Sequence, residues 1–192
     1  MSGDYSRKRF NPEKHYQGVL RQQGRVDLDA DWNEYVDLQD RRWRAETIDV
    51  VGRSGVPDET PDGFKIAVSG GELTVGQGRM YVDGYVAENH GTAPAFEPTL
   101  EEGYGTAALP VKNQPYGGPV TVPAQVRSLV YLDVWRREVT HLQAPDLIEP
   151  AVNVDSTTRY QTAWQVRVLA NIPPDITCDT PLSDIPGWPT GN

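Results

Sequence analysis

The chain has 192 residues, of which 38% are hydrophobic, with 18 Gly and 16 Pro, so it suits one ordinary domain or two small ones, rich in turns and short strands. A formal net charge of −9 argues against nucleic-acid binding, and the basic run at residues 41–44 is flanked by acids. The single cysteine excludes an internal disulfide. No apolar run is long enough for a membrane span or an export signal, so we expect cytoplasmic synthesis.

Residues 1–28 predict an extended arm with one tight turn at Asn11-Pro12. The arm is polar with spaced aromatic side chains, a composition that a large partner surface can order. We therefore expect the arm to dock on another protein. The side chains expected at this partner interface are Tyr5, Phe10, His15, Tyr16, Gln22 and Gln23.

Residues 29–52 predict one long helix, with Asp29 as the N-terminal cap and Gly52 at the C-terminal cap position. Apolar residues recur along it at spacings of three and four, as in a coiled-coil seam. Two explanations stay open for this stripe: the β domain of the same chain covers it, or identical subunits share it. The side chains expected in self-association are Trp32, Tyr35, Val36, Trp43 and Val50.

Residues 64–172 predict a mainly antiparallel β domain, a small sandwich or barrel, so the expected fold class is α+β. Asp83-Gly84 between β-forming residues is a strong signal for a hairpin with a type I′ turn. Residues 129–135 and 163–169 predict further strands, the first with apolar side chains on both faces. Residues 146–149 predict a short helix, and residues 173–192 an irregular tail.

Residue patterns for catalysis or metal binding are weak throughout the chain. Alternating carboxylates begin at Asp27, but Trp32 and Leu38 replace the Gly and Glu that an EF-hand loop requires. The three histidines are far apart, and neither a nucleophile elbow nor a phosphate-binding loop is present. We therefore expect no cofactor, no metal and no enzymatic activity. A hydrolase site assembled from distant residues is the remaining enzymatic alternative.

Several aromatic residues of the β region could instead stack on sugar rings. Strand aromatics more often fill a core, so the better candidates for glycan contact are the loop residues Tyr104 and Tyr116. The alternative function is therefore a carbohydrate-binding or adhesin domain that recognises a cell surface.

The N-terminal third of the chain resembles a domain family encoded with contractile injection systems and other phage-tail-like particles. The resemblance rests on the runs DYSR (residues 4–7), FNP (10–12), KHY (14–16) and VLRQQGRVDLDADWNE (19–34). It continues through shorter motifs: GR (78–79), YVDG (81–84), LVYLDVW (129–135) and WQVRV (164–168). Residues 91–124 do not share it.

This resemblance implies a structural component of the baseplate or tail fibre, with other particle proteins as partners and no catalysis. Fibre-like parts of such particles are commonly trimeric, so the resemblance favours a homotrimer. It also implies assembly into a particle that is released from the cell, and members that continue into longer C-terminal parts. Physically the N-terminal region divides at Asp29, with a docking arm before it and a self-associating helix after it.

Overall fold

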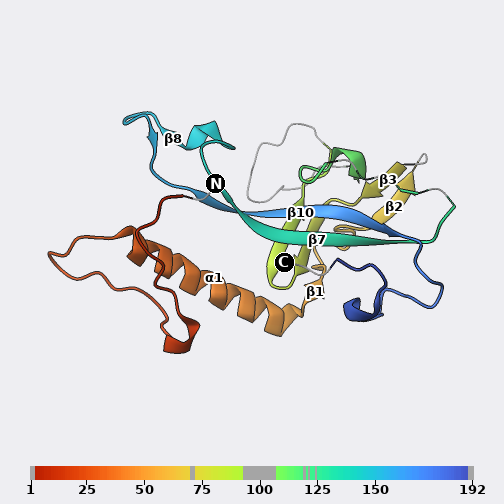
Figure 1. The fold of residues 1–192 in the computed structure, drawn as a ribbon, viewed down its shortest axis with the longest axis horizontal. Helices are drawn as coiled ribbons and strands as arrows, with labels where there is room; N and C mark the ends of the chain where they lie inside the picture. The colour runs from red at the N-terminus through yellow and green to blue at the C-terminus, as the bar shows by residue number, and fades with distance from the viewer. Residues whose placement is uncertain are drawn as a thin grey trace. The chain divides into compact units, whose positions relative to one another are not determined.

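The structure is a computed structural model that describes residues 3–69, 72–92, 107–118, 120, 122–123 and 125–189 (Figure 1). The chain divides into two compact units. The first comprises Met1–Gly55, Tyr81–Val86 and Arg136–Thr162, and the second Val56–Met80, Ala87–Trp135 and Ala163–Asn192. The expected β domain at residues 64–172 is therefore shared, because its segments 81–86 and 136–162 belong with the arm and the helix.

The long helix α1 spans Asp29–Val51, as the sequence predicts, and it follows a single 3-10 turn, η1, at Pro12–Lys14. Gly52 ends α1 with a positive φ of 92°, and its N–H donates to the Ile48 carbonyl at 2.9 Å. The predicted cap at the other end is wrong. Leu28 is the N-cap residue and gives no side-chain cap, while Asp29 is already helical.

The predicted Asp-Gly hairpin is confirmed. Strand β4 (Gly78–Val82) lies between β1 (Ser54–Gly55) and β5 (Tyr85–Asn89) in a three-stranded sheet. The turn between β4 and β5 has positive φ at both central residues, 47° at Asp83 and 79° at Gly84, as a type I′ turn requires.

Within the first unit, this turn and strand β7 hold the middle of α1. The Arg44 guanidinium lies 4.1 Å from the centre of the Tyr85 ring, and its Nη2 donates to the Asp83 carbonyl at 3.2 Å. Further along, Asp40 forms an ion pair with Arg136 of β7 at 2.6 Å. Polar contacts from two different strands therefore fix the same two turns of the helix.

The two longest strands are β7 (Ser128–Val139) and β10 (Arg159–Ala170), which pair with each other and run beyond the predicted ranges (Figure 1). Between them, η3 (Pro145–Leu147) takes the place of the expected short helix, because Pro145 starts a single 3-10 turn that β8 then ends. Strands β8 (Ile148–Glu149) and β9 (Val154–Asp155) form a small antiparallel pair.

The second unit contains the main core. Strand β3 (Glu72–Val75) pairs antiparallel with β2 (Ile66–Ser69) and with β6 (Leu109–Pro110), and η2 (Val111–Asn113) follows. Trp164 and Val166 of β10 and, from β7, Val130, Leu132 and Val134 reach this core. Among the described residues no sheet closes into a barrel. The buried core residues are Phe64, Val75, Ala87, Val111, Trp164 and Val166.

The C-terminal tail is irregular, as expected, but it is packed. Ile172, Ile176 and Ile185 are buried together against Leu129 and Leu169, around the 3-10 turn η4 (Leu182–Asp184). The tail therefore covers the second apolar face of β7, which explains why that strand has apolar residues on both sides although β10 is its only partner strand among the described residues. The α+β class with mainly antiparallel sheets is confirmed.

Candidate assembly surface

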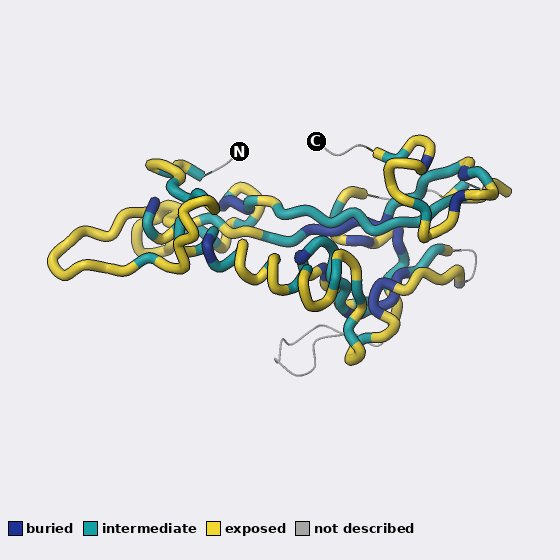
Figure 2. The backbone as a smooth tube through the Cα atoms, turned by 90° about the horizontal axis from the view of Figure 1, so that it is seen from below, coloured by how far each residue is buried: buried dark blue, intermediate teal, exposed yellow. Residues whose placement is uncertain are grey.

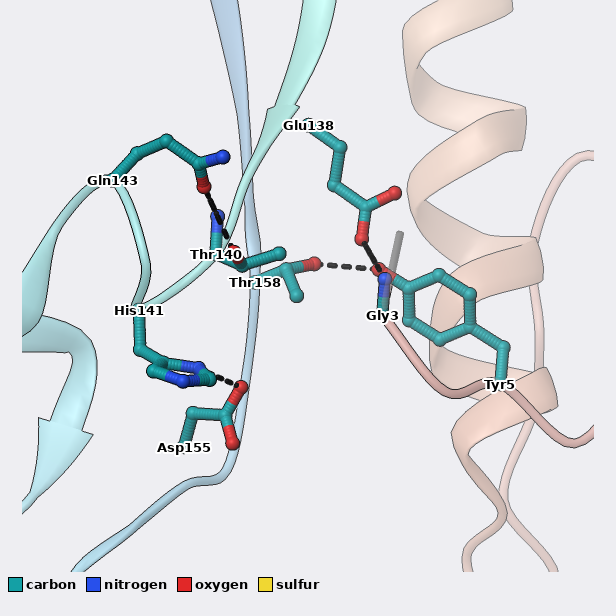
Figure 3. Close-up of polar contacts among 8 residues, drawn as sticks. All are labelled: Gly3, Tyr5, Glu138, Thr140, His141, Gln143, Asp155 and Thr158. Atoms are coloured by element: carbon teal, nitrogen blue, oxygen red, sulfur yellow. Dashed lines mark hydrogen bonds and ion pairs between the residues drawn. The ribbon is translucent and has the colours of Figure 1, made fainter. Parts of the chain in front are cut away.

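The first residues of the arm are bound within the first unit. The Tyr5 hydroxyl donates to Oε1 of Glu138 on β7 at 2.5 Å, and the Gly3 N–H donates to the same oxygen at 2.6 Å (Figure 3). The Thr158 hydroxyl lies 2.5 Å from the Tyr5 oxygen, and it is the donor there because the Tyr5 proton points to the carboxylate. We call these four residues the arm latch.

The latch has a marked electrostatic character. Donation from Tyr5 is the main reason that the pKa of the Glu138 carboxyl is lowered from its ordinary value, and the Gly3 N–H adds to it. Burial, and then the bond to Glu138, raise the pKa of the Tyr5 hydroxyl. Both shifts favour a neutral phenol beside an ionised carboxylate at neutral pH.

A second attachment joins the arm to the start of α1. The Ser6 N–H and hydroxyl donate to the two carboxylate oxygens of Asp29 at 2.8 and 2.6 Å, and Arg9 pairs with Asp31. The two bonds from Ser6 lower the pKa of Asp29, with the Ser6 hydroxyl as the largest cause. They also explain the failed cap prediction, since they occupy both carboxylate oxygens of Asp29.

Residues 10–28 form an open loop that leaves this attachment and returns to Leu28 (Figure 1), and nearly all of them are exposed (Figure 2). A turn closed by the Arg25 N–H and the Gln22 carbonyl at 3.3 Å forms its tip, and Arg21 pairs with Asp27 at 3.3 Å. Despite this exposure the loop carries large apolar side chains: Leu20 is 92% and Val26 83% exposed. We call residues 10–28 the arm loop.

The arm loop and the first two turns of α1 line one open groove of about 920 Å³. Charged side chains also line it, among them Arg9, Arg21 and Arg25 from the arm and Asp31 and Glu34 from the helix. The groove therefore combines apolar and charged side chains. Its apolar lining residues are Tyr16, Val19, Leu20, Val26, Leu28, Trp32 and Tyr35.

The predicted apolar stripe continues from this groove along α1. Trp32 is 62%, Trp43 65% and Val50 81% exposed, whereas Ala30 and Leu38 are the buried residues of the helix. Tyr35 is exposed and Val36 half-buried. Within the described residues of the first unit, nothing covers Trp32, Trp43 or Val50 fully.

The residues predicted for docking fall into two groups. Tyr5 belongs to the latch and Phe10 is half-buried. The others lie on the arm loop and are exposed, with the Lys14 ammonium 5.7 Å from the centre of the Tyr16 ring. This second group is His15, Tyr16, Gln22 and Gln23.

The two glycan candidates have different outcomes. Tyr104 lies outside the described residues. Tyr116 is half-buried and makes edge contacts with Trp135 and Trp164, with ring centres 6.4 and 6.5 Å apart. Its ring therefore packs against the core of the second unit.

The residues that sequence reasoning missed are Leu20, Val26 and Leu28 on the groove, and Glu138 in the latch. The three apolar residues were visible as isolated hydrophobic positions in a polar segment without periodicity. No sequence signal joins Glu138 to Tyr5, because 133 residues separate them.

The fold and this surface define the class: an α+β protein with one long helix, small antiparallel sheets and an N-terminal arm loop. The chain belongs to the family described as "Family of unknown function (DUF6519)", whose model matches residues 1–183. The match includes the arm loop and α1, so both are part of the family's own domain. Neither a curated protein nor a solved structure matches the chain.

Two further findings concern the described residues alone. None of their His, Cys, Asp and Glu side chains gather in threes or more in a way that could hold a metal ion. In the same ranges, no helix has the length and apolarity needed to cross a membrane.

Proposed function

We propose that this protein is a non-enzymatic structural subunit of a phage-tail-like contractile injection particle, at its baseplate or tail-fibre end. The arm loop docks on another particle protein, and copies of the chain associate through α1. The protein is made in the cytoplasm and leaves the cell with the assembled particle. The observation that carries the proposal is the exposed apolar groove formed by the arm loop and the start of α1.

Leaving such a surface exposed to water is unfavourable in free energy. Burying apolar area stabilises an association by about 25 cal/mol per Å², and contiguous exposed apolar patches usually mark interaction sites. Here Leu20, Val26 and Trp32 are all more than half exposed around one groove. Residues 3–9 are already bound to the first unit, so the arm loop is held in place before a partner arrives and less ordering entropy opposes docking.

The charge of the arm supports an acidic partner. Residues 1–28 contain six basic and three acidic side chains, a net charge of +3, while the whole chain carries −9. An arm of opposite sign to the rest of the chain is attracted to acidic surfaces that repel the remainder. Such complementarity raises the association rate and orients the encounter.

Particle incorporation tests the proposal. The double variant Leu20→Asp/Val26→Asp adds charge to the groove at side chains too exposed to support the fold. We expect the protein to stay folded and its amount in purified particles to fall at least tenfold. The control is Leu142→Asp/Val152→Asp, which makes the same chemical changes at residues outside the groove that are 58% and 61% exposed, and it should incorporate normally. Unchanged incorporation of the groove variant would refute the docking role.

The second candidate function, an adhesin, is supported by a hollow in the second unit. It has a volume of about 580 Å³ and is lined by Tyr131, Trp135, Gln165 and Arg167. Arg167 pairs with Asp133 at 3.0 Å, and aromatic rings beside a charged pair suit a sugar with its apolar face and hydroxyl groups. Among the described residues this hollow is the place to test glycan binding, and the contact expected at Tyr104 stays a prediction.

A glycan array with the full chain separates the two functions. An adhesin predicts a specific glycan signal that Trp135→Ala or Arg167→Ala abolishes and Tyr16→Ala leaves intact, since Tyr16 does not line the hollow. Absence of any specific glycan signal would remove the adhesin and leave the assembly subunit.

A further inference from the structure

Three exposed apolar side chains, Trp32, Trp43 and Val50, lie in line along most of α1 and form its apolar stripe. Trp43 and Val50 follow Trp32 by 11 and 18 residues, which is about three and five whole turns at 3.6 residues per turn. The stripe is therefore about 27 Å long at 1.5 Å per residue. A surface of this length and narrowness fits a second helix with a similar stripe, and α1 of another copy provides one.

The charges of α1 favour one orientation of two such helices. Residues 29–40 contain five acidic and no basic side chains, whereas residues 41–51 contain three arginines and two acids. Parallel packing would place the two acidic halves side by side. Antiparallel packing places each acidic half beside the arginine-containing half of the other copy and also opposes the two helix dipoles.

The arm loop adds a second argument. It lies on the flank of α1 that carries Asp31 and Tyr35. Viewed down the helix axis at 100° per residue, Glu46 lies about 40° and Asp49 about 100° from the stripe, on that same flank. In an antiparallel two-fold pair, equal flanks of the two helices meet and Trp32 faces Val50 of the other copy. The arm loop of each copy then lies beside the other copy's Glu46 and Asp49.

These groups are available for such a contact. Glu46 and Asp49 have no ion-pair partner among the residues that the structure describes. Arg25 on the loop is exposed, and Arg21 has only the exposed Asp27 as its partner. Exposed ion pairs of this kind contribute about 0–1 kcal/mol, so Arg21 can exchange its partner at little cost.

We propose that two copies associate through the stripes of α1 as an antiparallel two-fold pair, with Arg21 and Arg25 of each arm loop contacting Glu46 and Asp49 of the other copy. The inference rests on the proposed assembly role of this surface and identifies its self-association mode. It differs from the trimer that the sequence resemblance implies, because a two-fold contact closes with two copies.

Charge exchange between two variants tests the pair. In the variant Arg21→Glu/Arg25→Glu, an acidic arm loop of one copy would meet the acidic Glu46 and Asp49 of the other. In the variant Glu46→Arg/Asp49→Arg, the arm loop and the helix positions that it meets would both be basic. Sedimentation velocity should give a dimer for the wild-type chain at micromolar concentration and at least tenfold weaker dimers for each variant alone. An equimolar mixture should restore the dimer, because both loop–helix contacts of the mixed pair join opposite charges.

The control Lys65→Glu/Lys112→Glu makes the same change in net charge as the arginine variant, at exposed residues outside α1 and the arm loop, and should dimerise normally. A second measurement uses Val50→Cys in a Cys178→Ser background. In the antiparallel pair the two introduced thiols are far apart, so no interchain disulfide is expected after mild oxidation. Efficient disulfide formation, a trimer mass, a monomeric wild-type chain, or a mixture that fails to restore pairing would each overturn the inference.

Failure of the antiparallel pair can be distinguished from failure of the proposed function. A monomeric or parallel protein that still loses particle incorporation on Leu20→Asp/Val26→Asp would refute the antiparallel pair alone. Normal incorporation of that variant would refute the docking role, whatever the oligomeric state.

Discussion

Removing one oxygen atom from the arm latch should loosen the arm without unfolding the protein. Tyr5→Phe deletes the hydroxyl that donates to Glu138 at 2.5 Å. A hydrogen bond to a charged group contributes about 1.5–3 kcal/mol, and the half-buried position of both residues reduces this to about 1 kcal/mol because solvent competes. Local opening of the arm should therefore become about fivefold more frequent.

Amide hydrogen exchange over residues 3–9 measures this opening directly. The control is Tyr16→Phe, the same chemical change at an exposed tyrosine of the arm loop, for which we expect no effect at residues 3–9. Equal protection in Tyr5→Phe and the wild-type chain would mean that the latch does not hold the arm, and the argument for a preformed loop would fail with it.

The pH dependence of hydrogen-exchange protection at residues 3–9 follows from the shifted pKa values of Glu138, Asp29 and Tyr5. The pKa values of Glu138 and Asp29 are lowered in the folded chain, so their contribution is present above the ordinary carboxyl value and is lost as pH falls through the folded values. The pKa of Tyr5 is raised, so its contribution is complete below its ordinary value and is lost as pH rises through the folded value. Protection should thus extend from about pH 5 to about pH 9. In Tyr5→Phe the alkaline loss attributable to Tyr5 should vanish, while the acid loss due to Asp29 remains.

Two matched pairs test the packing in each unit. Trp164→Ala should lower the free energy of unfolding in urea by about 3–5 kcal/mol, because Trp164 is 2% exposed and its indole donates to the Glu88 carbonyl at 2.7 Å. Its control, Trp43→Ala at an exposed site, should change the free energy of unfolding of the monomer by less than about 0.5 kcal/mol. Gly84→Ala should destabilise the chain more than Gly24→Ala: both sites have positive φ, but only at Gly84 would the new methyl group meet the carbonyl oxygen of Arg44, at 2.8 Å. Equal effects within either pair would contradict the packing described.

Much of the local structure was predictable because its causes are local. The period of the apolar residues and Gly52 at the C-terminal cap predict α1 almost to the residue. The turn at Asp83-Gly84 follows from the positive φ angles that Gly accepts at little cost. The lengths of β7 and β10 were underestimated. Strand β7 continues past residue 135 through Arg136, whose side chain pairs with Asp40 of α1.

The N-terminal cap illustrates how a tertiary contact overrides a local preference. An isolated helix would use the carboxylate of Asp29 for its own N–H groups. In the folded chain Ser6, 23 residues earlier, takes both oxygens of that carboxylate. Tyr5 shows the same effect, since a residue predicted for docking is bound to Glu138 of the same chain, while Leu20 and Val26 remain exposed.

The sequence by itself determined the α+β class, the single long helix with its apolar stripe, the type I′ hairpin and the polar arm. Each of these depends on residues close together in the chain, where periodicity and turn chemistry act directly. Only the tertiary structure decided that the arm is held by Glu138 and Asp29, that residues 10–28 are its free part, and that the loop and α1 share one apolar groove. Such features depend on pairs of residues far apart in the sequence, and no local pattern records which of them meet.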